Sequence, residues 1–372
     1  MKRVIAATLA SVVPLAVLDA AIPTDNRLST PLDRVVGQAV AEFMVDRCRV
    51  GVSVVVHTQR RDRFYNYGTV NRGRAELPSA DSVYELASVT KTLVGALAAK
   101  ALADGKMSLD GDFRAFLPGA YANLEAGGHP ITLRSLATHM AGLQRDLPDS
   151  DAVMGRHDYD HIGYELAALD AGFTEAKSLQ ALHGVTLRSE PGARFVYSNI
   201  GIRVIGYGLE KVYHTSLAQL LAQDILGPLG MTKTSFEPTQ AMRALEVTPY
   251  SRFGHVQPYH DANAGAAYGL YSTPRDMARY LAWQLDEHDA VVARAHALIR
   301  GTEEDGQGLI WNIGRDGNQR VLWHGGGSFG ETSQMVIYPD SGDGFVLLAN
   351  DACEGSEGAL KKIAMDVHHA AH

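Results

Sequence analysis

The sequence predicts a mixed α/β (α+β) fold: one antiparallel sheet of about five or more strands, flanked by helices, with an inserted, mostly helical domain. Strand-like segments gather towards both ends of the 372-residue chain, and helical patterns fill the middle. A sheet built from both ends of the chain is the economical arrangement. We expect a sheet domain from residues 27–80 plus 255–372, a helical domain from residues 81–254, and the functional site between them.

The first predicted elements form a hairpin followed by a helix. Residues 50–57 (Val-Gly-Val-Ser-Val-Val-Val-His) are rich in β-branched side chains and predict a strand; a polar turn at 58–63 and a second strand near 64–67 follow. Residues 88–104 predict a helix, because Leu93, Leu97 and Leu102 fall roughly on one face and Gly105 can end it.

The middle of the chain, about 108–240, is mostly helical in pattern, and the last third changes character. A clear helix is expected over 200–213, where apolar residues recur at helical spacing. Short apolar runs at 308–313, 321–323, 333–338 and 345–350 alternate with turns rich in Gly and Asp, which predicts an antiparallel meander. A last helix over about 354–369 is expected to follow.

Composition and charge narrow the functional class. The chain is 46% hydrophobic and 20% charged, and its net charge is −8 with no long basic run. A nucleic-acid partner is therefore not expected. Residues 1–20 predict a signal peptide: Lys2 and Arg3 precede a mostly apolar run over 4–18 that is shorter than the roughly 20 residues needed to span a bilayer. We expect export and no membrane span after cleavage, with a short anchor as the alternative.

Three short motifs can carry chemistry, and the first is Ser88-Val89-Thr90-Lys91. Residues three apart share a helix face, so the Lys91 amine can reach the Ser88 hydroxyl. Serine is a weak nucleophile and needs a base or a polarising cation beside it. At a helix start, the macrodipole also stabilises a developing alkoxide. Alone, the pattern is equally compatible with a solvated helix start.

The second motif is Tyr197-Ser198-Asn199, directly before the predicted helix over 200–213. A tyrosine there can act as acid or base if a neighbouring cation lowers its pKa. The Asn199 amide can hold a substrate carbonyl and also contact Lys91. The alternative is a tyrosine that packs with its hydroxyl in water.

The third motif is His324-Gly325-Gly326-Gly327, at the end of an apolar run. Glycines on a strand edge let a substrate backbone approach closely. Free backbone N–H groups there can bind an oxyanion, and a basic side chain can attract a carboxylate. A Gly-rich turn with an incidental histidine is the alternative.

Taken in order, the three motifs resemble the penicillin-recognising serine hydrolases, which include class C β-lactamases, low-molecular-mass D-Ala-D-Ala peptidases and related esterases. The resemblance runs from about residue 30 to 350 and extends to longer segments. These are SVYELASVTKTLVGALAAKALADGK (82–106), ITLRSLATHMAGL (131–143), PGARFVYSNIGIRVIG (191–206), LGPLGM (226–231) and GLYSTPRDMARYL (269–281). It implies a β-lactamase/transpeptidase-like fold and no cofactor.

The resemblance also implies roles for individual residues. Ser88 would attack a carbonyl and form an acyl-enzyme, with Lys91 and Tyr197 sharing the proton transfers. The strand 324–327 would bind the substrate: Gly326 beside it, the N–H of Gly327 with that of Ser88 as the oxyanion hole, and His324 supplying positive charge near a carboxylate. Asn199 would bind the acyl amide of the substrate.

A periplasmic β-lactamase is the first function that the resemblance implies, and a D-Ala-D-Ala carboxypeptidase or endopeptidase is the second. An esterase and a sensor without turnover are further alternatives; the substrate would be a small β-lactam or a D-Ala-D-Ala peptide. His324-Gly325-Gly326 stands where most class C enzymes have Lys-Thr-Gly. Histidine keeps its charge only below about pH 6.5 unless a neighbour raises its pKa, so the substrate class stays open.

The family fold gives an expectation for the two cysteines. In that fold the first strand pairs with the last, which would bring Cys48 close to Cys353 and allow a disulfide. The fifteen histidines show no metal-binding motif, so no metal site is expected. The tail with His368, His369 and His372 is the place most suited to scavenge zinc.

Overall fold

A computed structural model describes residues 22–260 and 265–372; the predicted signal peptide lies outside these residues. Eight strands form one sheet in the order β2-β1-β13-β12-β11-β10-β9-β8, and every pairing in it is antiparallel. Their bounds are β1 (Gly51–Thr58), β2 (Arg61–Gly68), β8 (Arg300–Gly301), β9 (Asp305–Gln307), β10 (Asn312–Asp316), β11 (Gln319–Gly327), β12 (Thr332–Tyr338) and β13 (Asp343–Ala349). The N-terminal hairpin thus joins the C-terminal meander at β1–β13, which confirms the predicted fold class.

One predicted strand is partly wrong. The apolar run at 308–313 was expected to be extended throughout, but β10 begins only at Asn312. Leu309, Ile310 and Trp311 are buried in irregular backbone, and the N–H of Leu309 donates to the carbonyl of Ala295. A short apolar run shows that side chains are buried, but not which backbone conformation buries them.

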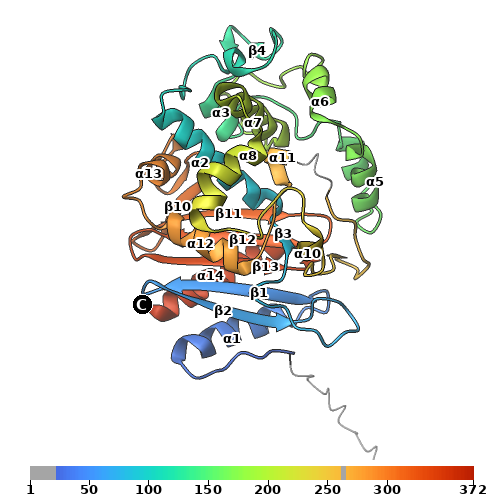
Figure 1. Ribbon diagram of the computed structural model, residues 1–372, viewed down its shortest axis with the longest axis vertical. Helices are drawn as coiled ribbons and strands as arrows, with labels where there is room; N and C mark the ends of the chain where they lie inside the picture. Colours follow the sequence, from blue (N-terminus) through green and yellow to red (C-terminus); the bar gives the residue numbers. More distant parts are fainter. Residues whose placement is uncertain (1–21, 261–264) are drawn as a thin grey trace, which may run out of the picture.

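Helices α1 (Pro31–Phe43) and α14 (Ser356–Ala371) pack against each other and cover one face of the sheet. In Figure 1, α1 is drawn below the strands and α14 at their level. Successive residues of a strand point to opposite faces. Accordingly, Phe345 and Leu347 of β13 pack in the core under these two helices, and Val346 and Leu348 pack in the larger core on the other side. The sheet is therefore buried on both faces.

The opposite face packs against the larger group of helices. The larger core there includes side chains of α2 (Thr90–Ala103), α7 (Asn199–Tyr213), α12 (Pro274–Gln284) and α13 (Ala290–His296). Shorter helices are α3 (Leu133–Ala137), α4 (Asp151–Met154), α5 (Ile162–Asp170), α6 (Glu175–Leu182), α8 (Leu217–Leu221), α9 (Gly227–Leu229), α10 (Gln240–Arg243) and α11 (Gly265–Tyr268). In Figure 1, α2, α3, α7 and α8 are drawn above the sheet, and α12 overlaps it. Three small pairs complete the strands: β3 (Tyr84–Glu85) with β7 (Tyr271–Ser272), β4 (Glu125–Ala126) with β5 (His129–Pro130), and β6 (Tyr250–Ser251) with β14 (Asp351–Ala352). Within 22–260 and 265–372, no helix is both long and apolar enough to cross a membrane.

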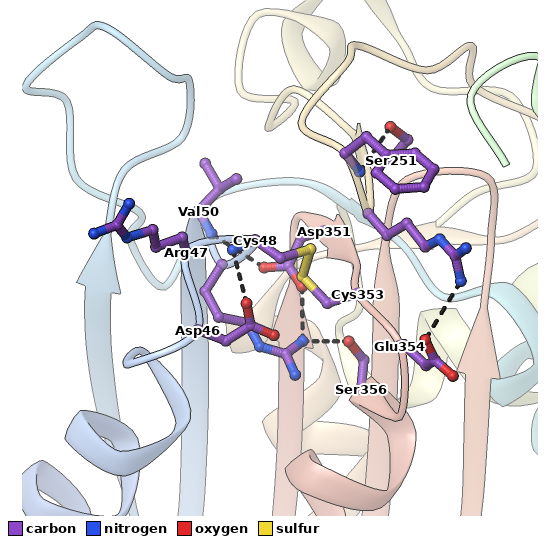
Figure 2. The surroundings of a disulfide bond; sticks show 12 residues. Asp46, Arg47, Cys48, Val50, Ser251, Asp351, Cys353, Glu354 and Ser356 are labelled. Carbon is purple, nitrogen blue, oxygen red and sulfur yellow. Dashed lines mark hydrogen bonds and ion pairs between the residues drawn. A yellow bond between two sulfur atoms is a disulfide. The ribbon is translucent and has the colours of Figure 1, made fainter.

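A disulfide joins Cys48, just before β1, to Cys353, just after β14 (Figure 2). The two Cα atoms are 5.9 Å apart, and the residues are separated by 305 positions in sequence. The same region holds a buried ion pair, in which Arg49 donates to Asp351 at 3.0 Å and also contacts Ser356. Both chain segments are therefore tied together by covalent and ionic contacts.

Replacing Cys48 and Cys353 together with serine should lower the free energy of unfolding by about 2–4 kcal/mol, because the cross-link restricts a long loop in the unfolded chain. Denaturant titrations of the double variant and the wild type measure this difference. Wild-type protein treated with a reducing agent should shift in the same direction. Equal midpoints for all three samples would show that the cross-link adds nothing to stability.

Candidate active site

Ser88 lies in the short 3₁₀ turn over 87–89 that leads directly into α2. Its Oγ is 2.7 Å from Nζ of Lys91, one helical turn further on, and 2.8 Å from the hydroxyl of Tyr197, which precedes α7. Residues more than 100 positions apart therefore converge on one oxygen atom. The structure brings together the three residues that the sequence assigns to catalysis.

The backbone before Ser88 is held in an unusual conformation. Ala87 has φ = 45°, a left-handed value that is uncommon for a residue with a side chain. The preceding residue, Leu86, donates its N–H to the carbonyl of Leu270 at 2.8 Å and accepts a hydrogen bond from Oγ of Ser333 at 2.6 Å. These contacts with β12 and with the segment before β7 offset the strain and hold Ser88 at the start of α2.

Lys91 is completely buried. Burial lowers its pKa well below the ordinary value, although the carboxylate of Asp146 opposes the shift. Its Nζ also donates to the carbonyl of Ala267, which holds the amine beside Ser88. A neutral amine in this position has a lone pair that can accept the Ser88 proton.

Tyr197 is held between aromatic and cationic neighbours. Its ring packs on His139 with centroids 4.4 Å apart, and the guanidinium of Arg145 lies 5.5 Å from the ring centroid. Burial nevertheless raises the pKa of Tyr197 to about 12, so the idea that a neighbouring cation makes it acidic is wrong. In the free protein Tyr197 is a phenol, which favours a role as proton donor.

His324, at the end of β11, is buried and does not carry the expected positive charge. Its Nδ1 is 2.7 Å from the carbonyl of Gly325, which can only accept, so Nδ1 carries a proton, and in the neutral ring the lone pair is on Nε2. Burial lowers the pKa of His324 to about 4, and nearby Lys91 shifts it in the same direction. The lowered pKa argues against the predicted role of this residue as a cation for a substrate carboxylate.

A histidine titration measures this directly. His324 should remain neutral down to about pH 4, and kcat/KM for anionic substrates should show no step from this residue near pH 6.5. Because the unfolded chain takes up this proton near pH 6.5, the neutral buried ring should make stability fall as pH drops from about 6.5 towards about 4. Imidazole NMR of wild type and His324→Gln assigns the signal. A midpoint near 6.5 would restore the cationic role.

Asn199 begins α7, and its amide is oriented by Asp146. The amide nitrogen donates to Oδ1 of Asp146 at 2.6 Å, and a carboxylate can only accept, so the nitrogen must face it. Oδ1 of Asn199 is buried without a hydrogen-bond partner among the residues that the structure describes. The open group is an acceptor suited to a substrate N–H. The Asp146 contact uses only one of the two N–H groups of the amide, so binding of a substrate carbonyl by the other N–H stays a prediction.

Gly326 lies against the backbone of the nucleophile. A Cβ on this residue would be 2.7 Å from the Ser88 nitrogen, 2.7 Å from the Leu86 carbonyl oxygen and 2.5 Å from Oγ of Ser333. Only a glycine allows β11 to approach the Ser88 turn this closely. The next residue, Gly327, lines the same space as Ser88, as the predicted oxyanion hole requires.

Substituting Gly326 with alanine should therefore lower kcat by about 100-fold or more, because a displacement of about 1 Å at the nucleophile is enough for such a loss. Gly184→Ala is the matched control, since a Cβ there meets its nearest neighbour at an ordinary 3.5 Å. Steady-state kinetics and melting temperature should be measured for both variants. Full activity in a folded Gly326→Ala protein would contradict the close approach.

Two cavities open at Ser88, and both are also lined by Arg145 and Gly327. The Asn199 cavity, of about 290 Å³, extends between Asp146, Tyr268 and the apolar side chains of α5. The Glu357 cavity, of about 420 Å³, extends along the end of β11 to the start of α14. The second contains Tyr197, His324, Trp323, Gln334, Glu357 and Lys361. A substrate bound at Ser88 can thus place one part in each.

Three residues of the site carried no readable signal in the sequence. His139 falls within the segment 131–143 but belongs to no catalytic motif, and its role as support for Tyr197 depends on the fold. Asp146 and Glu357 were missed because each is one of several acidic residues in its segment and belongs to no catalytic motif. Asp146 belongs to the site because it accepts a hydrogen bond from Asn199, and Glu357 because it lies close to the glycines of β11.

Among the described residues, one group has the spacing of a metal site: Asp343, His368 and His372, whose ligand atoms all lie within 4.8 Å of one another. It is at the end of α14 and outside both cavities. Nδ1 of His368 and Nε2 of His372 are 3.0 and 2.5 Å from the same carboxylate oxygen of Asp343. These contacts fix the last turn of α14 to β13.

Comparisons with known proteins agree with this arrangement. The family model for Beta-lactamase matches residues 36–369. The D-alanyl-D-alanine-carboxypeptidase/endopeptidase AmpH of Escherichia coli K12 is 25% identical over 315 residues, covering 79% of this chain and 77% of that protein. Protein flp of Staphylococcus aureus N315 is 23% identical over 296 residues; the match covers 77% of this chain but only 56% of flp.

Solved structures show the same fold. A β-lactamase/D-alanine carboxypeptidase from Pseudomonas syringae superposes with a TM-score of 0.77 at 18% identity, covering 92% of this chain and 100% of the other. A structure described as a class C β-lactamase gives the same TM-score and identity, covering 94% of this chain and 98% of that one.

Proposed function

This chain belongs to the Beta-lactamase family, and we propose that it is a serine hydrolase that works through an acyl-enzyme on Ser88. The observation that carries the proposal is the convergence of Lys91 Nζ and the Tyr197 hydroxyl on Ser88 Oγ, at 2.7 and 2.8 Å. A hydroxyl next to a buried amine and a phenol is equipped for proton transfer in both directions. A protein that only binds its ligand has no need of all three groups.

In the proposed acylation step, Ser88 Oγ forms a bond to the substrate carbonyl carbon and its proton passes to Lys91. The N–H groups of Ser88 and Gly327 stabilise the resulting oxyanion. Collapse of the intermediate breaks the bond to the leaving group, which receives a proton from Tyr197, and Lys91 then restores the proton of Tyr197. In deacylation a water molecule replaces the leaving group, and the same transfers run in the opposite direction.

The substrate class is the finer part of the proposal. We place β-lactams first and D-Ala-D-Ala peptides second, supported by the family and by the name of the AmpH relative. Both classes carry a carboxylate near the scissile bond, and a neutral His324 offers it no charge. This favours a further candidate, hydrolysis of esters or amides whose leaving group lacks a carboxylate.

The deciding experiment follows labelling and product release with a fluorescent penicillin, in parallel with a neutral thioester. Rapid release of hydrolysed penicillin supports a β-lactamase, and a stable label supports a peptidase or a sensor. Thioester turnover without penicillin labelling supports the ester or amide hydrolase. Labelling that persists in Ser88→Ala would overturn the nucleophile assignment.

We further propose that the protein works in the periplasm, and that its site lies between a sheet domain (27–80 and 255–372) and a helical domain (81–254). The export proposal is supported by the cationic and apolar character of residues 1–20. Fractionation of cells expressing the full chain, with N-terminal sequencing of the mature protein, tests it.

A further inference from the structure

We propose that the Glu357 cavity is a leaving-group subsite that favours a cationic or uncharged leaving group and disfavours one that carries a carboxylate. This inference rests on the acyl-enzyme function proposed above and assigns Glu357 as a residue that determines its specificity. The leaving group would be an alcohol, a thiol or an amine that is either uncharged or carries an additional ammonium group. It is bonded to the acyl group that Ser88 attacks.

The position of Tyr197 indicates which cavity receives the leaving group. The leaving atom must take up a proton as its bond to the carbonyl carbon breaks. Tyr197, the buried phenol beside Ser88, lines the Glu357 cavity, whereas Asn199, with its open acceptor, lines the other. The leaving group therefore belongs on the Glu357 side, and the acyl group, with its N–H, on the Asn199 side.

The Glu357 carboxylate lies over the glycine strand that would contact the substrate. It projects from the first turn of α14, and a Cβ placed on Gly325 would be only 2.4 Å from its Oε2. A Cβ on Gly327 would be 3.3 Å from its Oε1. The side chain is exposed to the cavity, so a leaving group that follows the strand away from Ser88 meets a carboxylate.

The cations near this cavity act on Glu357 without pairing with it: burial raises the pKa of Glu357, and Lys91 and Arg145 oppose that shift. No cation forms an ion pair with it in the part of the chain that the structure describes. Arg145 is paired with Asp146 at 3.4 Å, and the ammonium of Lys361 lies 3.2 Å from the centroid of the Trp323 ring. Since His324 is neutral and the two cations of the lining, Arg145 and Lys361, are held by Asp146 and Trp323, a carboxylate on the leaving group would be repelled by Glu357, and an ammonium group would be attracted.

Three N-acetyl-D-alanyl thioesters of similar size test the assignment. Their leaving groups are thiocholine (cationic), its uncharged carbon isostere, and 3-mercaptopropionate (anionic), and each released thiol is measured with a chromogenic disulfide. Because both cysteines of the chain are paired, the protein contributes no thiol of its own. The quantity compared is the ratio of kcat/KM for the cationic and anionic esters within each protein, which cancels any general loss of activity.

Wild type should prefer the cationic ester, and Glu357→Gln should reduce the cationic-to-anionic ratio by about tenfold, as expected for one unit charge acting at a few ångströms in a partly hydrated cavity. Glu354→Gln is the matched control: this glutamate is 88% exposed, pairs with Arg252 and does not line the cavity, so it should keep the wild-type ratio. Added salt should weaken the preference in wild type.

Two results would overturn the inference. One is a wild-type preference for the anionic ester; the other is the same ratio in Glu357→Gln and wild type. Turnover of the neutral ester by wild type and by Ser88→Ala distinguishes failure of the subsite inference from failure of the proposed acyl-enzyme function. If the neutral ester is hydrolysed equally well by Ser88→Ala, the acyl-enzyme itself is wrong; if it is not, only the subsite is wrong.

Discussion

Replacing Ser88 with alanine should abolish acyl-enzyme formation and lower kcat by roughly 10⁴-fold or more, as loss of the nucleophile does in other serine hydrolases. Lys91 and Tyr197 remain in place in this variant, but neither can form the ester that links enzyme and acyl group. The substitution removes one half-buried hydroxyl and no carbon atom from the core. The melting temperature should therefore change little.

Intact-mass spectrometry after brief exposure to substrate, together with turnover of the neutral thioester, measures the effect. Ser341→Ala, in a turn after β12, is a control for loss of a serine hydroxyl elsewhere in the chain. An acyl adduct of unchanged mass and yield on Ser88→Ala would place the nucleophile on another residue.

Substituting Lys91 should cost nearly as much, because the buried amine is the base that activates Ser88. Lys91→Met, which keeps most of the volume, should lower kcat by roughly 10³-fold or more. Lys91→Arg separates two roles: arginine keeps the charge but cannot give up its proton, so it should also be inactive if the neutral amine is required. In wild type, activity should rise as pH passes the lowered pKa of Lys91.

Burial complicates these substitutions, since Lys91 also donates to the carbonyl of Ala267. Circular dichroism and the melting temperature establish whether each variant is folded before its rate is interpreted. A folded Lys91→Arg enzyme with near wild-type kcat would show that a fixed positive charge is sufficient and that Lys91 is not the base. A pH–rate profile of wild type without an acid limb would lead to the same conclusion.

Much of the fold could be read from local patterns. The apolar strands at 50–57, 333–338 and 345–350 and the helical spacing over 200–213 could be predicted because residue type and periodicity are properties of neighbouring residues. The run at 308–313 was misjudged because Leu309, Ile310 and Trp311 are buried although their backbone is irregular. A short apolar run shows no periodicity that would distinguish a strand from an irregular segment.

Ser88, Lys91 and Tyr197 could be selected from the sequence because their motifs, each weak alone, occur in the order and context of the penicillin-recognising serine hydrolases. The structure corrected the chemistry of their neighbours. His324 was expected to be a cation, but its pKa is lowered to about 4, and the amide oxygen of Asn199 is left as a buried acceptor without a partner among the described residues. Both features depend on residues distant in sequence: burial in the folded chain, with the charge of Lys91, lowers the pKa of His324, and Asp146 accepts from the amide nitrogen of Asn199.

The sequence by itself determined which groups could react and on which elements they lie, since a Ser-x-x-Lys at a helix start is defined within one turn. Only the tertiary structure decided the charges and orientations of these groups. Burial sets the protonation of Lys91, Tyr197 and His324, and packing of α14 against β11 brings Glu357 over the glycines. Desolvation and Coulomb interaction depend on distance in space, and these distances exist only once the sheet has joined the two ends of the chain.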